Sequence, residues 1–214
     1  MKAETITEKI KAAATASEKM TGKNLSLPVL KSILLIAKQK SLIIKATNLD
    51  LGIEYEIPAK VEEEGVVAIP GSVLGGVLSN LQGEEMIVIE SVNNNILLST
   101  KKNSTVLKTT PYEDFPLIPK ISNSEKITLS IEKVITGLRS VWYSASLSDI
   151  KPEISSVYVY QNDKNIVFVA TDSFRLAEKK IENKKSTNFE GAIIPLKNVT
   201  EIIRVFSDCS GNVE

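Results

Sequence analysis

The sequence predicts an α+β protein made of repeated domains, in each of which two helices pack on antiparallel sheets. The first observation behind this prediction is an internal repeat, since short segments recur 124 to 125 residues later in the same order. The second is the order of elements, because each copy runs from an amphipathic helix through short β-rich segments to another helix. The chain has 214 residues, a comfortable length for two domains.

Five matches carry the repeat, and each is weak by itself. The first four share a shift of 124 residues, and the last has a shift of 125 because the second copy has one extra residue between the fourth and fifth matches. Matches in one order at a nearly constant shift indicate a duplicated structural unit. They are Glu8-Lys9-Ile10 with Glu132-Lys133-Val134, Pro28 with Pro152, Leu42-Ile43-Ile44 with Ile166-Val167-Phe168, Ala46-Thr47-Asn48 with Ala170-Thr171-Asp172, and Ile69-Pro70 with Ile194-Pro195.

The first copy opens with a helix predicted over residues 7–20. Apolar or small side chains recur there near helical spacing, at Ile6, Ile10, Ala13, Ser17 and Met20. A proline-marked turn follows, and a second helix is expected after Ile69-Pro70, over residues 71–81. Short β-rich segments complete the copy, and we expect strands at residues 32–36, 42–46, 51–57, 85–90, 96–100 and 104–110.

The second copy repeats this order over a shorter stretch. Its first helix is predicted over residues 130–145, with Val134, Leu138, Val141 and Trp142 on the apolar side, and we expect Trp142 and Tyr143 in the core. Further strands are expected at residues 156–160, 165–171 and 175–181, and the second helix at 196–206. No counterpart of the last three strands follows. We therefore expect a complete domain at 1–122 and a truncated one at 123–214, with a linker near 117–124.

Composition excludes several classes of function. Lysine plus arginine equals aspartate plus glutamate, 26 each, so any contact with nucleic acid must come from a local basic face. The sequence has no histidine, which removes the commonest general base and metal ligand. Its one cysteine, Cys209, excludes a zinc cluster of cysteines and an intrachain disulfide. We expect a cytoplasmic protein with no cofactor, no metal, no catalytic residues and no membrane segment.

The motifs resemble a known family. The chain is similar to the bacterial DNA polymerase III β subunit, the DNA sliding clamp, and Thr-Asp-x-x-Arg-Leu is the most specific of the shared motifs. The resemblance implies the DNA-clamp fold, no enzymatic activity, and a ring of two three-domain chains. This chain would supply the first domain, much of the second and none of the third. The matching segments are residues 27–30, 46–51, 69–70, 114–116, 169–177 and 193–197.

The resemblance implies that the two helices of each domain face double-stranded DNA. Lysine and arginine side chains there would make sequence-blind contacts to phosphates, which suits a protein that slides. Lys23 and Asn24, and also Ser72, stand where the family often has an arginine, so we expect weaker contacts there. For any single lysine, a solvated helix face is an equally good interpretation. The candidate DNA-binding residues are Lys9, Lys11, Lys19, Lys23, Asn24, Lys133, Arg139, Ser148, Lys151, Lys197 and Arg204.

The resemblance also implies a pocket on the second domain that accepts short peptides. Its partners would be DNA polymerase III subunits, the clamp loader and other proteins with a clamp-binding motif. Apolar walls beside an arginine stem and a polar edge suit an extended peptide. Without the family, a plain strand-turn-strand segment is the favoured interpretation. The candidate residues are Ile154, Thr171, Ser173, Phe174, Arg175 and Leu176.

A third surface would close the ring. The family uses the strand at residues 104–110 to extend a sheet across the dimer interface, with Thr105 and Leu107 as candidates. Without a third domain we expect a monomer, or a non-native association through this edge. Two other classes stay open, a free-standing peptide-binding module and an enzyme that uses Asp172, Ser173 and Arg175.

Overall fold

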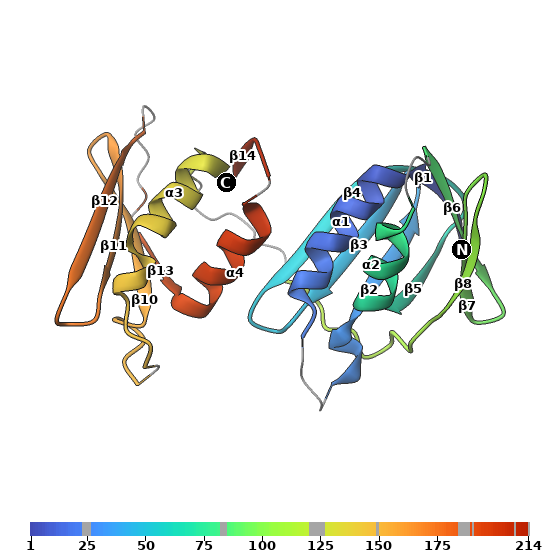
Figure 1. Cartoon of the computed structure of the whole chain (residues 1–214), viewed down its shortest axis with the longest axis horizontal. Helices are drawn as coiled ribbons and strands as arrows, with labels where there is room; N and C mark the ends of the chain where they lie inside the picture. The colour runs from blue at the N-terminus through green and yellow to red at the C-terminus, as the bar shows by residue number, and fades with distance from the viewer. Residues whose placement is uncertain are drawn as a thin grey trace. The chain divides into compact units, whose positions relative to one another are not determined.

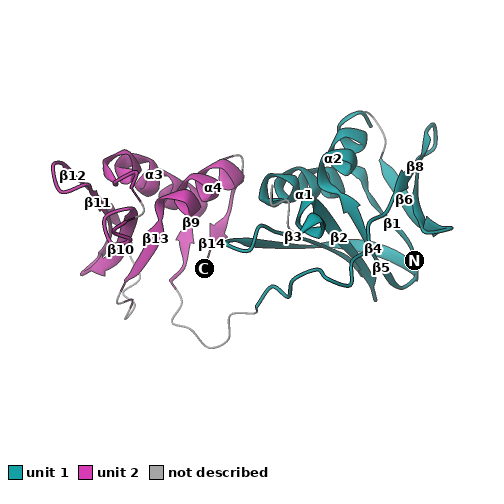
Figure 2. Cartoon of the chain, turned by 90° about the horizontal axis from the view of Figure 1, so that it is seen from below, with its two compact units in different colours: residues 1–119 teal, residues 120–214 magenta. Residues whose placement is uncertain are grey.

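The structure is a computed structural model that consists of two compact units (Figures 1 and 2). Unit 1 comprises Met1–Pro119 and unit 2 comprises Lys120–Glu214. The residues described are 1–22, 27–81, 85–119, 127–148, 150–183, 189, 191–207 and 209–213. The domain boundary predicted after residue 122 therefore lies outside the described residues.

Unit 1 is built on an antiparallel sheet in the order β5-β2-β3-β4-β1-β6-β7-β8. Two helices, α1 (Thr7–Met20) and α2 (Gly71–Ser79), pack against each other, and α1 also packs on β3 and β4 (Figure 1). A short 3₁₀ helix, η1 (Pro28–Lys31), precedes β2. The strands are β1 (Lys2–Ile6), β2 (Ser32–Lys38), β3 (Ser41–Thr47), β4 (Gly52–Glu63), β5 (Gly65–Pro70), β6 (Met86–Val92), β7 (Asn95–Ser99) and β8 (Ser104–Lys108).

The long strand β4 joins the two halves of this sheet. Its first part pairs with β3, from Gly52 to Pro58, and its last part pairs with β1. Beyond β8 the chain returns to β5, where Thr110 N–H donates to the carbonyl of Ala68 at 2.9 Å. The hydroxyls of Ser32 and Thr110, 2.9 Å apart, reinforce that contact. The two ends of the sheet are therefore tied together at one point.

Unit 2 has a smaller sheet in the order β12-β11-β10-β13, with α3 and α4 packed on it. A separate pair, β9 (Leu129–Ser130) with β14 (Asn212–Val213), lies beside the start of α3. The core gathers buried residues of α3, β10, β11 and α4, and Phe168 is one of them. The remaining elements are α3 (Ile131–Val141), the 3₁₀ helix η2 (Trp142–Ser144), β10 (Ser156–Asn162), β11 (Asn165–Thr171), β12 (Leu176–Glu182), β13 (Ala192–Pro195) and α4 (Leu196–Phe206).

The two units repeat the same hairpin at the predicted shift. In unit 1, β2 and β3 are joined after the pair Lys38–Ser41, and Gln39 has a φ of 57°. In unit 2, β10 and β11 are joined after Asn162–Asn165, and Asp163 has a φ of 51°. Both tight turns have a non-glycine residue in the left-handed region, which two-residue hairpin turns of this kind require. The predicted fold class, two helices on antiparallel sheets in repeated units, is confirmed.

Two details of the sequence prediction are wrong. Ile6 ends strand β1 and is exposed, so it does not belong to the buried face of α1. Trp142 and Tyr143 are also exposed, at 37% and 53%, where we expected core residues. The reason is that α3 ends at Val141, and the 3₁₀ turn that follows changes the helical spacing on which the prediction depended.

Candidate functional site

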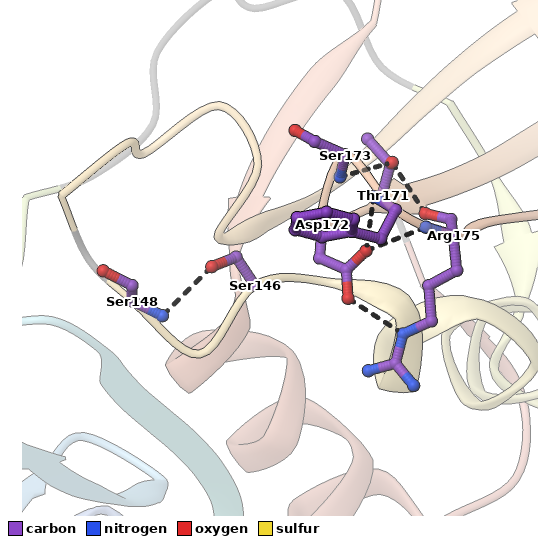
Figure 3. A network of polar contacts seen from close by, with 7 residues as sticks. Ser146, Ser148, Thr171, Asp172, Ser173 and Arg175 are labelled. Carbon is purple, nitrogen blue, oxygen red and sulfur yellow. Dashed lines mark hydrogen bonds and ion pairs between the residues drawn. The ribbon is translucent and has the colours of Figure 1, made fainter.

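The turn between β11 and β12 is held by its own first side chain (Figure 3). The Thr171 hydroxyl donates to the carbonyl of Arg175 at 2.7 Å and accepts the N–H of Ser173 at 3.1 Å. Ser173 has a φ of 76°, in the left-handed region, and is exposed. A polar side chain that bonds to the backbone two residues further on is typical of such tight turns.

Asp172 makes most of the remaining polar contacts of the turn. Its Oδ1 accepts the N–H of Phe174 at 3.0 Å and of Arg175 at 2.9 Å, and its Oδ2 pairs with Nε of Arg175 at 3.0 Å (Figure 3). These contacts lower the pKa of Asp172, first through the N–H of Arg175, then through that of Phe174, with the arginine charge adding to the effect. The contacts of the turn thus favour the ionised form of the carboxylate.

Two large apolar side chains at this turn are mostly exposed to solvent. Phe174 is 98% exposed and Leu176 is 66% exposed. Ile154 is half-buried just before β10. Because β10 and β11 are antiparallel and Tyr158 faces Val169, the beginning of β10 and the end of β11 lie at the same end of the hairpin. The register therefore brings Ile154 to the end of the sheet where the Thr171–Arg175 turn begins.

Two further apolar residues at this end escaped the sequence analysis. Leu147 and Ile150 are 90% and 87% exposed, in the loop that leads to Ile154. The Ser146 N–H closes this loop by donating to the carbonyl of Ile154 at 2.9 Å, and the Ser148 N–H donates to the Ser146 hydroxyl at 3.1 Å (Figure 3). In the sequence, Leu147 and Ile150 could have been noticed as two large apolar residues within an otherwise polar loop.

The predicted DNA-binding residues are spread over both units and differ in what their side chains contact. Lys9 and Lys197 are exposed on α1 and α4, and Lys11 and Lys19 are half-buried on α1. Lys133 donates to the carbonyl of Glu182 at 2.6 Å, Arg139 donates to the Ser207 hydroxyl at 2.8 Å, and Arg204 pairs with Glu201. Ser148 and Lys151 are exposed in the loop before β10, whereas Lys23 and Asn24 lie outside the described residues.

The strand at the end of the unit 1 sheet presents a free edge. Among the described residues, β8 pairs with β7 alone. Thr105 is exposed, but Leu107 is only 5% exposed and lies opposite the buried Ile96. The Leu107 side chain therefore belongs to the core of unit 1. The exposed apolar residue of this strand is Val106, at 62%, which was not among the predicted interface residues.

Comparisons with known proteins give the chain a family. A family model described as DNA polymerase III beta subunit, N-terminal domain, matches residues 2–119, and the model of the central domain of that subunit matches residues 128–214. The chain belongs to the DNA polymerase III beta subunit family. Within it, the chain is 25% identical to the Beta sliding clamp of Staphylococcus epidermidis over 197 residues, which are 88% of this chain and 52% of that protein.

Solved structures of the family share the fold of this beta-subunit chain. A putative DNA polymerase III beta subunit from Eubacterium rectale covers the whole chain with a TM-score of 0.90 at 20% identity, and 59% of its own length is covered. The sliding clamp from Bacillus subtilis gives a TM-score of 0.88, also at 20% identity, with 58% of its own length covered. The chain spans about half the length of the curated relatives it matches.

Two negative findings concern the described part of this beta-subunit chain. No helix there is long and apolar enough to cross a membrane. The same residues contain no group of three or more histidine, cysteine, aspartate or glutamate side chains that could hold a metal ion.

Proposed function

We propose that this chain forms part of a DNA sliding clamp, which encloses duplex DNA and holds replication proteins to it. The observation that carries the proposal is the match of two successive domains of the beta subunit, in order, over residues 2–119 and 128–214. The curated relatives are named Beta sliding clamp, which supports a role in processive DNA synthesis. The protein would act by binding, as a non-enzymatic processivity factor.

The contact with DNA would be sequence-blind and weak. Lys9 and Lys197 are exposed on their helices, which supports contact with phosphates. Lys133 and Arg139 contact groups of their own unit, and α2 (Gly71–Ser79) carries no charged residue. Each phosphate contact of an exposed lysine or arginine releases counterions, so the affinity should fall as salt is added. Such a surface relies on enclosure of the DNA for its grip.

The partner surface would be the apolar end of unit 2. Phe174, Leu176, Leu147 and Ile150 are all more than half exposed, and exposed apolar residues of this kind support docking of a short peptide. Polymerase III subunits, the clamp loader and other proteins with a clamp-binding motif are the partners we propose. The dimer ring would close through the backbone edge of β8, with Thr105 and Val106 at the surface of that edge and Leu107 beneath it.

A chimeric protein tests the clamp function. Residues 1–214 replace the aligned portion of the Staphylococcus epidermidis Beta sliding clamp, and the clamp loader of that organism places the chimera on nicked circular DNA. The chimera should remain on closed circles through gel filtration and be lost when one cut linearises the DNA. The unmodified clamp is the control. Retention that does not depend on closure of the DNA would contradict enclosure.

The two alternatives predict different results. A free-standing peptide-binding module would bind peptide tightly as the 214-residue chain and would show no dependence on DNA topology. An enzyme that uses Asp172, Ser173 and Arg175 would lose a hydrolytic activity on Ser173→Ala. The hydrogen bonds of Asp172 go to the backbone N–H groups and guanidinium of its own turn, which favours an architectural turn over a catalytic group.

A further inference from the structure

The chain contains an internal control for the turn at the apolar end of unit 2. The equivalent turn of unit 1 runs from Thr47 to Leu51, and its first hydroxyl donates to the carbonyl of Leu51 at 2.8 Å and accepts the N–H of Leu49 at 3.1 Å. Leu49 has a φ of 78°, close to the 76° of Ser173. The backbone path is therefore the same in both turns.

The second residue of the unit 1 turn is neutral. The amide oxygen of Asn48 accepts the N–H of Asp50 at 3.1 Å and of Leu51 at 2.8 Å, the two bonds that Oδ1 of Asp172 makes in unit 2. A neutral amide oxygen thus suffices to build the turn. The negative charge and the second oxygen of Asp172 are not needed for it.

What the charge adds in unit 2 is the contact with Arg175. Oδ2 of Asp172 pairs with Nε at 3.0 Å, and unit 1 has Leu51 in the place of the arginine. The arginine side chain is 59% exposed, and exposed ion pairs contribute little to stability. The pair does constrain the long arginine side chain, which otherwise samples many rotamers. The ion pair therefore orients the Arg175 side chain more than it stabilises the fold.

We propose that Asp172 is a positioning residue, which holds Arg175 through Nε so that its two terminal nitrogens point to a docked peptide. This inference rests on the proposed docking of partner peptides at unit 2. Figure 3 shows the terminal nitrogens directed away from the carboxylate. Arginine presents its donors in a rigid fork, so fixing Nε also fixes the direction of the other nitrogens.

The same contact selects the chemistry of the peptide group that Arg175 binds. Asp172 and Arg175 together carry no net charge, so the pair offers directed donors without a net attraction for anions. A carbonyl oxygen of the peptide main chain suits such donors, whereas a carboxylate would meet the charge of Asp172 at close range. The apolar side chains of the peptide would contact the exposed Phe174 and Leu176.

Binding of an uncharged probe tests the proposal on the 214-residue chain. The probe is an acetylated, amidated hexapeptide that contains one leucine, one phenylalanine and no charged residue, and its Kd is measured by NMR titration. Asp172→Asn keeps the two bonds that Asn48 makes in unit 1, so the turn should persist. Loss of an ordered arginine should weaken binding about three- to tenfold. Asn48→Asp, the reverse change in unit 1, is the matched control and should leave the Kd unchanged.

Two readouts separate positioning from a structural role. The Nε–H signal of Arg175 should exchange faster with water in Asp172→Asn, while the amide signals of Phe174 and Arg175 keep their positions. In an Arg175→Leu background, Asp172→Asn should have no further effect on the Kd. Equal peptide binding by the wild type and Asp172→Asn, or unchanged Nε–H exchange, would overturn the positioning role. Failure of the wild type to bind any probe would instead contradict peptide docking by this chain, and the Nε–H exchange would still decide whether Asp172 orients Arg175.

Discussion

Unit 1 and unit 2 build the same turn at the end of the same hairpin, but they present different side chains at its tip. In unit 1 the tip carries Leu49 and Asp50, and in unit 2 it carries Ser173 and Phe174, of which Phe174 is almost fully exposed. The bonds that both units share run from threonine, asparagine or aspartate to the backbone. Contacts common to both copies thus define the architecture, and the side chains that differ are the candidates for function.

The cores of the two units differ in a related way. Where α3 crosses β11, unit 2 places Gly137 against Phe168, and an added Cβ at Gly137 would lie 2.4 to 2.6 Å from three ring atoms. The positions 124 residues earlier are Ala13 and Ile44, both buried. Compared with unit 1, unit 2 thus has a smaller residue on the helix and a larger residue on the strand. The two copies distribute side-chain volume differently across the same helix-sheet contact.

The largest expected effect comes from adding one methyl group in unit 2. Gly137→Ala places Cβ closer to the Phe168 ring than real contacts allow, and neither the helix nor the buried ring can move away freely. Overpacking of this kind costs about 3 kcal/mol of the free energy of unfolding, which urea denaturation followed by circular dichroism measures. Gly76→Ala in α2 is the matched control, since no atom lies within 4 Å of its added Cβ. That control should stabilise the protein by about 0.5–1 kcal/mol.

The residues of unit 1 at these two positions suggest a compensating double variant. The double variant Gly137→Ala, Phe168→Ile gives unit 2 the pair that unit 1 has at these positions. It should recover about half or more of the lost free energy, because the smaller side chain leaves room for the added methyl group. A double variant no more stable than Gly137→Ala alone would show that the backbones of the two units differ at this crossing.

The next effect concerns the threonine that begins each turn. Thr47 is 5% exposed, so Thr47→Ala removes a buried hydroxyl that bonds the carbonyl of Leu51 and the N–H of Leu49. We expect a loss of about 1–3 kcal/mol of the free energy of unfolding. Thr171 is only half-buried, and water can replace its hydroxyl, so Thr171→Ala should cost about 1 kcal/mol or less. Threonine to serine at either position keeps the hydroxyl and serves as the control. Equal losses in the two units would contradict the role of burial.

Some of these features can be predicted from the sequence because local chemistry decides them. The helix over residues 7–20 follows from its spacing, and Asp172-Ser173 suits a turn by itself. Other features depend on contacts distant in the chain. Strand β1 (Lys2–Ile6) alternates small and polar side chains, and its burial depends on pairing with β4 and β6. Leu107 faces inward because it pairs with the buried Ile96 on the neighbouring strand. The hydrogen bond from Lys133 to the carbonyl of Glu182 also joins residues far apart in the sequence, so the residues near Lys133 do not predict it.

The smallest expected effect is a pH dependence of the melting temperature, which the turn of unit 2 should cause and the turn of unit 1 should not. Contacts with the Arg175 and Phe174 N–H groups and with the guanidinium lower the pKa of Asp172 in the folded protein below the ordinary 3.8. A carboxyl group with a lowered folded pKa stabilises the fold at pH values above its unfolded pKa, and this contribution disappears as the pH falls through the folded value. Asn48 does not titrate, so the turn of unit 1 has no such dependence. Asp172→Asn should therefore make the melting temperature fall less steeply as the pH is lowered through and below 3.8. Asn48→Gln should leave this acid slope of the melting temperature unchanged. A slope that survives Asp172→Asn would assign the acid sensitivity to other carboxylates.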